Sequence, residues 1–189
     1  MNMNSFYTEE ELKELGLKSY GKDVLISRKA SIYSPSKIII GNNVRIDDFC
    51  ILSGKIEIGS NVHISAFVAL YGGDEGIYFD DCSGASARTT IFALTDDFSG
   101  EYMTNSMIEE KYRNVIKGKV KIGKYAQIGA NCVVLPNVII GEGCAVGALS
   151  LVKNSLEDFT ICAGVPCKKI KDRSKRLLDL AKEREEEYE

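Results

Sequence analysis

Aliphatic residues recur at every sixth position along two long tracts of the chain. The first tract runs from Ile40 to Leu70, and the second runs from Ile122 to Val152. Two residues before each aliphatic position stands a second apolar residue, usually a small one, and glycine often follows. A period of six fits neither the 3.6-residue turn of an α-helix nor the two-residue alternation of a strand. The pattern therefore predicts a solenoid of stacked repeats.

Each repeat would supply one inward aliphatic side chain and one turn. Three repeats, roughly 18 residues, then complete a triangular coil whose inward residues stack on those of the next coil. The residue before each inward aliphatic points outward, and in the second tract these residues are apolar: Val133, Ile139, Ala145 and Leu151. We expect them to form one face that another copy of the chain covers. In the first tract Arg45 and His63 stand 18 residues apart, so they should lie one above the other.

Two further signals divide the chain. Thr8 followed by Glu11 is a capping box, which predicts a short N-terminal helix. A long polar stretch at about 93–117 interrupts the solenoid, as a functional insertion does. We expect an N-terminal helical cap, a solenoid domain that contains this excursion loop, and a tail with a C-terminal helix, at residues 1–23, 24–160 and 161–189.

Composition excludes several classes of protein. A formal net charge of −3 and the lack of any Lys/Arg run argue against a nucleic-acid-binding protein. The chain has no apolar stretch long enough to span a membrane, and its N-terminus lacks the order of a signal peptide. Cys50, Cys132 and Cys144 occupy the small apolar position of the repeat, and the other three cysteines form no CxxC pair. We therefore expect a cytoplasmic protein with free thiols and no metal site.

The second tract and the tail after it carry a resemblance to a known family. The sequence IGKYAQIGANCVVLPNVIIGEGCAVGALSLV, followed by CAGVPCKKI, resembles the hexapeptide-repeat acyltransferases. This resemblance implies a left-handed parallel β-helix, a homotrimer, and acyl-CoA, with acetyl-CoA as the expected donor. The stretch SARTTIFALTDDFSGEYMTN is similar to the branch that acylates hydroxyls or amines of sugars, including nucleotide-linked amino sugars and surface-polysaccharide units.

The resemblance also implies where acyl-CoA binds. In the family the pantetheine arm lies in a cleft between neighbouring β-helices, along small residues that leave it room. The matching positions here are Ala130, Gly147, Ala148, Ser150 and Ala163. Basic residues near the tail meet the CoA phosphates, and Lys153, Lys168 and Lys171 occupy comparable places. The same residues also fit a simpler interpretation, in which the small side chains only allow tight turns and the lysines are solvated.

Many members of the family use a histidine of the excursion loop as general base. This loop has none, and Asp96 and Asp97 stand in its place, while the only histidine of the chain is His63. His63 can be the base, because its unperturbed pKa near 6.5 suits proton transfer at neutral pH. Alternatively, Asp96 or Asp97 accepts the proton or holds an ammonium group of the substrate. Thirdly, an amine that arrives unprotonated needs only to be positioned by the aspartate.

Four other residues complete the predicted site. Ser86, in the coil before the loop, is expected to hydrogen-bond near the reacting centre. Glu101 and Tyr102 of the loop, and Arg45 in the polar band of His63, are expected to contact the sugar substrate. Asp96 and Asp97 also fit a purely structural role, because aspartate often caps turns.

Three other functions fit the sequence less well. A non-catalytic trimeric scaffold of the same fold is the alternative, although the retained CAGVPCKKI tail argues against it. A zinc carbonic anhydrase needs several histidines per site, and the chain has one. A nucleotidyltransferase needs an additional nucleotide-binding domain, for which 189 residues are too few.

Overall fold

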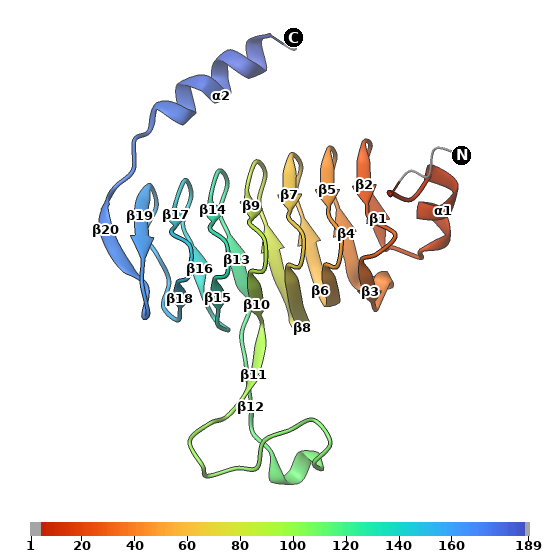
Figure 1. The fold of residues 1–189 in the computed structure, drawn as a ribbon, viewed down its shortest axis with the longest axis vertical. Helices are drawn as coiled ribbons and strands as arrows, with labels where there is room; N and C mark the ends of the chain where they lie inside the picture. The colour runs from red at the N-terminus through yellow and green to blue at the C-terminus, as the bar shows by residue number, and fades with distance from the viewer. Residues whose placement is uncertain (1–4, 188–189) are drawn as a thin grey trace.

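The computed structural model describes residues 5–187, and its main body is a parallel β-helix (Figure 1). The expected fold class is confirmed, including the short N-terminal helix, the excursion loop and the C-terminal helix. The inward aliphatic positions are buried, and they stack in register: Ile46, Ile64, Ala85, Ile128 and Val146 follow one another across successive coils. Each such side chain contributes on the order of 1.5–3 kcal/mol through burial. Many modest contributions therefore hold the solenoid together.

The coils have three faces. The first face is an eight-stranded sheet of β2 (Val24–Ile26), β5 (Val44–Ile46), β7 (Val62–Ile64), β9 (Gly84–Ala85), β14 (Gln127–Ile128), β17 (Ala145–Val146), β19 (Thr160–Ala163) and β20 (Lys168–Asp172). Its strands pair in parallel except for β19 with β20, which are antiparallel.

The second and third faces share one ten-stranded sheet, because two long strands, β6 (Ile51–Ile58) and β8 (Ala69–Phe79), run through both. The second face adds β3 (Ser31–Tyr33), β10 (Thr90–Phe92), β15 (Val133–Val134) and β18 (Leu151–Val152). The third face adds β1 (Ser19–Tyr20), β4 (Ile38–Ile40), β13 (Val120–Ile122) and β16 (Ile139–Ile140). We call the turns between the first and second faces the first corner, those between the second and third faces the second corner, and the remaining turns the third corner.

The excursion loop leaves the solenoid at the second corner. It is a hairpin whose arms, β11 (Leu94–Asp96) and β12 (Val115–Lys117), pair antiparallel. A short 3-10 helix, η2 (Glu110–Tyr112), lies on its return arm. Figure 1 shows the hairpin projecting from the opposite side of the solenoid to α2. The hairpin therefore carries its side chains well beyond the surface of the chain's own coils.

The ends of the solenoid carry the other short elements. The capping box is confirmed: Thr8 and Glu11 exchange hydrogen bonds at the start of α1 (Glu9–Glu14). Another 3-10 helix, η1 (Pro35–Lys37), precedes β4. The C-terminal helix α2 (Arg176–Glu186) was expected to reach Glu189, which lies outside the described residues. Among residues 5–187, no helix is both long and apolar enough to span a membrane.

One expectation about the surface is confirmed and another is wrong. Arg45 and His63 do pair in neighbouring coils of the first face. The apolar outward residues do not form one face: Val133 and Leu151 pair on the second face, Ile139 lies on the third and Ala145 on the first. The reason is geometric, because outward positions six residues apart fall on successive faces, and only every third repeat returns to the same face.

Truncation of one buried side chain should destabilise the whole stack of coils. Ile128 is fully buried between Ala85 and Val146, and replacing it with alanine leaves a cavity that the coils above and below cannot close. We expect Ile128→Ala to lower the free energy of unfolding by about 2–5 kcal/mol in urea titration. Lys121→Ala, on the exposed side of a strand, is the matched control and should change it by less than about 0.5 kcal/mol. A loss below about 1 kcal/mol for Ile128→Ala would contradict the packing described.

Candidate active site

Small residues of successive coils line the first corner. Ser86, Gly129 and Gly147 each follow a strand of the first face, and Ala163, the last residue of β19, stands at the same register. A Cβ built on Gly129 would lie 2.6 Å from the backbone nitrogen of Ala148, and one on Gly147 would lie 2.9 Å from the Cβ of Ala163. The corner is therefore packed backbone against backbone.

The predicted cofactor residues Ala130, Gly147, Ala148 and Ala163 all belong to this corner. Ser150 is buried at 2% exposure, and its hydroxyl donates to the carbonyl of Gly147 and accepts from the nitrogen of Gly164. Ser150 therefore holds the turn together from inside.

The predicted lysines are divided between two corners. Lys168 and Lys171 are exposed on β20, which pairs with β19 beside the first corner. Lys153 follows β18 and lies exposed at the second corner, across the width of the second face. Within one chain, the three lysines do not surround one point.

His63 and Ser86 lie close together in the coil stack. His63 pairs with Gly84, and Ser86 follows Gly84 by two residues. The Ser86 hydroxyl accepts a long hydrogen bond of 3.4 Å from the Nε2 of Gln127 in the next coil. His63 and Ser86, both predicted from the sequence as site residues, therefore lie in neighbouring coils beside the same corner.

Sequence reasoning missed the carboxylate that His63 contacts. The Nε2 of His63 lies 2.8 Å from one oxygen of Asp47, and the Nε of Arg45 donates to the other oxygen at 2.7 Å. Burial raises the pKa of Asp47, but the hydrogen bonds from Arg45 and His63 outweigh it and lower that pKa overall. Because an ionised carboxylate only accepts, the Nε2 of His63 must carry a hydrogen, which leaves Nδ1 as the free nitrogen when the ring is neutral. The available signal was positional: Asp47 stands two residues after Arg45, at the end of the same strand.

Asp96 lies on the hairpin and is held from two sides. One oxygen accepts from the Nη2 of Arg113 at 2.9 Å, and the other accepts from the backbone nitrogen of Asn105 at 3.1 Å. The bond from Arg113 is the main cause that holds the pKa of Asp96 below its usual range, followed by the bond from Asn105. Asp96 is therefore a fixed anion with little tendency to keep a proton.

Asp97 has a different environment. Its oxygens accept from the backbone nitrogen of Ser99 at 2.7 Å and from the side-chain amide of Asn114 at 2.8 Å, and its own nitrogen donates to the carbonyl of Asn114. Hydrogen bonds from Ser99, and then from Asn114, lower its pKa. These contacts bridge the two arms of the hairpin. They fit the turn-capping role better than a catalytic one.

A cavity of about 520 Å³ lies at the root of the hairpin, beside Asp96. The rings of Tyr71 and Phe92 stack along it with centroids 5.2 Å apart. Asp96 and Arg113 supply its charged groups, while the predicted Glu101 and Tyr102 lie exposed on the hairpin beyond it. The cavity thus combines an aromatic surface with a single ion pair, as small-molecule sites often do.

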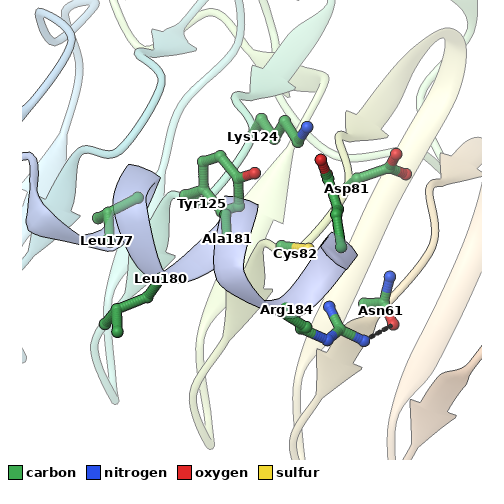
Figure 2. A pocket seen from close by; sticks show the side chains of 10 residues that line it. Asn61, Asp81, Cys82, Lys124, Tyr125, Leu177, Leu180, Ala181 and Arg184 are labelled. Carbon is green, nitrogen blue, oxygen red and sulfur yellow. Dashed lines mark hydrogen bonds between the residues drawn. The ribbon is translucent and has the colours of Figure 1, made fainter. Parts of the chain in front are cut away.

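A larger cavity, of about 690 Å³, lies away from all of these residues. Figure 2 shows it between α2 and the third corner, where Leu177 and Ala181 of the helix face Tyr125 and Cys82. The guanidinium of Arg184 donates to the side-chain oxygen of Asn61 at 3.0 Å and ties the end of the helix to the solenoid. None of the predicted site residues lines this cavity.

Comparison with known proteins agrees with this geometry. A family model described as bacterial transferase hexapeptide (six repeats) matches residues 37–72 and 119–154. A dTDP-4-amino-4,6-dideoxy-D-glucose acyltransferase of Escherichia coli is 44% identical over 179 residues, which cover 93% of each chain.

Solved structures give the same result. AntD, an N-acyltransferase from Bacillus cereus in complex with dTDP and 3-hydroxybutyryl-CoA, is 54% identical with a TM-score of 0.97, covering 98% of this chain and 99% of its own. AntD has also been solved with dTDP-4-amino-4,6-dideoxyglucose and coenzyme A, in a form substituted at one serine. Other AntD structures carry substitutions at an aspartate ten positions after that serine.

These relatives resolve the choice between an enzyme and a non-catalytic scaffold. Identity of 44% over nearly the full length of a curated acyltransferase is far above what a shared fold alone requires. The chain belongs to the hexapeptide-repeat transferases, and within them it is an acyl-CoA-dependent acyltransferase that acylates a hydroxyl or amine of a sugar.

Proposed function

We propose that the chain transfers an acyl group from acyl-CoA to the amine of dTDP-4-amino-4,6-dideoxyglucose or a close analogue. The Escherichia coli relative is named for this substrate, and AntD has been solved in complex with it. The observation that carries the proposal is a spacing. In this chain, Ser86 and Asp96 are the one serine and aspartate separated by the ten positions that separate the two substituted residues of AntD.

Asp96 suits the binding of an amine. Its carboxylate is held by Arg113 and Asn105, and each carboxylate oxygen retains a lone pair for a further donor. It can therefore receive N–H bonds from the acceptor and orient the nitrogen toward the thioester. The nitrogen attacks the carbonyl carbon, the C–N bond forms as the C–S bond breaks, and the proton released from nitrogen balances the CoA thiolate. The products are an amide and free CoA.

His63 is then a supporting residue and not an obligatory base. It is half exposed and is held by Asp47, on the wall of the first face. Its free Nδ1 lies on a surface that also carries Arg45, which suits contact with the phosphates of a nucleotide-linked sugar.

The acyl group is the other part of the donor. The sequence favours acetyl, whereas AntD has been solved with 3-hydroxybutyryl-CoA. We propose that this chain accepts short acyl groups of this kind. Both co-substrates carry phosphates and cross membranes poorly, which supports action in the cytoplasm.

We propose that the enzyme is a homotrimer packed around the second face. Outward residues there are uncharged, and the central ones are apolar or small: Ile51, Ala69, Thr90, Val133 and Leu151. The other faces mix apolar outward residues, such as Ile139 and Ala145, with charged or polar ones. The first face instead presents Arg45, His63 and Gln127, and the third presents Glu57 and Lys121. A face of this kind needs cover, and a closed three-fold arrangement covers it in every copy.

Three-fold symmetry has a consequence for the site. If the second face of each copy points at the axis, the first corner of one copy lies beside the second corner of the next. Ser86 and the small residues stand at the first corner, while Asp96 and Lys153 stand at or beyond the second. The arrangement brings together residues that one chain keeps apart.

Kinetics of two variants distinguish the roles of Asp96 and His63. With dTDP-4-amino-4,6-dideoxyglucose as acceptor, we expect Asp96→Asn to lose about tenfold to a hundredfold in kcat/KM, because a hydrogen bond to a charged group contributes about 1.5–3 kcal/mol. His63→Asn should lose less than about tenfold, whereas loss of a general base costs about a hundredfold or more. A larger loss for His63→Asn than for Asp96→Asn would make His63 the base. No turnover of this acceptor by the native enzyme would refute the proposed substrate.

Mixed trimers test whether two copies share one site. Ala148 is exposed at the first corner, so Ala148→Trp should block acyl-CoA there without disturbing the core, while Asp96→Asn disables the hairpin. Co-expression of these two impaired chains should restore about a quarter of native activity, the fraction of sites that pair an intact corner with an intact hairpin. Activity no higher than that of the separate variants would show that each site lies within one chain.

The lysines give a prediction about the donor. Calorimetric titration with coenzyme A should show about one site per chain, with affinity reduced about threefold to tenfold in Lys153→Ala and in Lys171→Ala, because each removes a charge from the phosphates. Lys13→Ala, on α1 at the far end of the solenoid, is the control and should bind as the native enzyme does. Unchanged affinity in both test variants would exclude these lysines from the donor site.

A further inference from the structure

Arg113 stands opposite Asp96 on the return arm of the hairpin, just after η2. Its Nη2 lies 2.9 Å from the carboxylate, and the two side chains are 15% and 24% exposed. The other surface ion pairs of the described residues include at least one side chain that is a third or more exposed. The Arg113–Asp96 pair is therefore the one best shielded from water, and it lies in the wall of the hairpin-root cavity.

The pair leaves a donor unsatisfied. The Nε of Arg113 is buried and has no hydrogen-bond partner within the described part of the chain. A buried donor without a partner destabilises a fold, and an arginine kept for packing alone is expected to satisfy it. The side chain is instead placed so that its Nη2 reaches Asp96.

The two arms of the hairpin are held together without the Arg113–Asp96 ion pair. Its arms are joined by the β11–β12 ladder, in which Leu94 faces Lys117 and Asp96 faces Val115. They are joined again by Asp97, which bonds Asn114 through both its backbone and its side chain. The contact from Arg113 adds to a connection that other groups already make.

We propose that Arg113 is a positioning residue for the acceptor, which fixes the Asp96 carboxylate at the rim of the cavity so that it receives the substrate amine. The inference rests on the proposed function, because it requires an amine that binds Asp96. The backbone nitrogen of Asn105 holds the second oxygen, so the carboxylate is fixed in its plane by one donor on each oxygen. Its remaining lone pairs are those available to the amine.

The electrostatic effect of Arg113 agrees with this geometry. Its hydrogen bond is the largest cause of the lowered pKa of Asp96. Arg113 thus favours the ionised form of Asp96, and an ionised carboxylate is a strong acceptor for the N–H groups of an amine.

Variants at Arg113 test the proposal through the two Michaelis constants. Arg113→Met should raise KM for dTDP-4-amino-4,6-dideoxyglucose about tenfold and leave KM for acyl-CoA within twofold, while Arg113→Lys should recover part of the loss by restoring a cation. Because Arg113 acts through Asp96, the double variant Asp96→Asn/Arg113→Met should be no worse than Asp96→Asn alone. Additive losses in the double variant would overturn the proposal.

Two controls separate positioning from hairpin stability. Asn114→Ala breaks the bridge from Asp97 and loosens the hairpin without touching Asp96, so it should affect acceptor KM less than Arg113→Met does. Lys111→Met, an exposed change on the same arm, should be silent. The contrary result is that Asn114→Ala and Arg113→Met raise KM for the acceptor equally and equally reduce the protection of hairpin amides from hydrogen exchange. That result would make Arg113 merely structural.

Failure of the role proposed for Arg113 can be distinguished from failure of the proposed function. If the native enzyme acylates the amino sugar and Asp96→Asn is impaired while Arg113→Met is not, only the role of Arg113 is refuted. If the native enzyme does not turn over this acceptor, the proposed substrate itself is refuted, and the assignment of Arg113 is refuted with it.

Discussion

The stack of inward aliphatic side chains is the constraint on which the rest of the molecule depends. Each coil must place three such residues over those of the previous coil, as Ile64 lies over Ile46 and Val146 over Ile128. The register of every outward residue follows, because the residues before and after a buried one have no freedom to slide. Corners therefore form straight columns. The small residues of the first corner stand in one column for this reason and not because any local contact gathers them.

The same register explains which features of the fold could be predicted from the sequence. The repeat, the two terminal helices, the excursion and the pairing of Arg45 with His63 all follow from periods or caps that local residues encode. The prediction that the outward apolar residues share one face is wrong, because the six-residue period moves to the next face at each repeat and returns only at every third. The contact between Asp47 and His63 crosses from one coil to the next, so a linear pattern shows it only after the register is known.

The pairing of Arg113 with Asp96 could not be predicted from the sequence, for a different physical reason. The hairpin has no period, and the pairing of Asp96 with Val115 depends on the length and turns of the segment between its arms. Sequence alone therefore identified the carboxylates at the start of the excursion but not the cation that faces one of them. It also gave no physical reason to rank Asp96 above Asp97. That distinction rests on which carboxylate lines the cavity and which one bridges the arms.

The amine acceptor proposed above explains how a carboxylate can stand where the family resemblance leads one to expect a histidine. A hydroxyl must give up its proton as it attacks, because the protonated ether-like oxygen that would otherwise form is a very strong acid, and this demands a base. A neutral amine attacks through its lone pair and can release its proton after the C–N bond has formed. The protein then has to hold the nitrogen in place more than it has to remove a proton. A carboxylate whose pKa is held low by Arg113 and Asn105 is a poor base, but it is well suited to orient an N–H donor. In the proposed reaction, the features that weaken Asp96 as a proton acceptor are thus the ones that suit it to orient the amine.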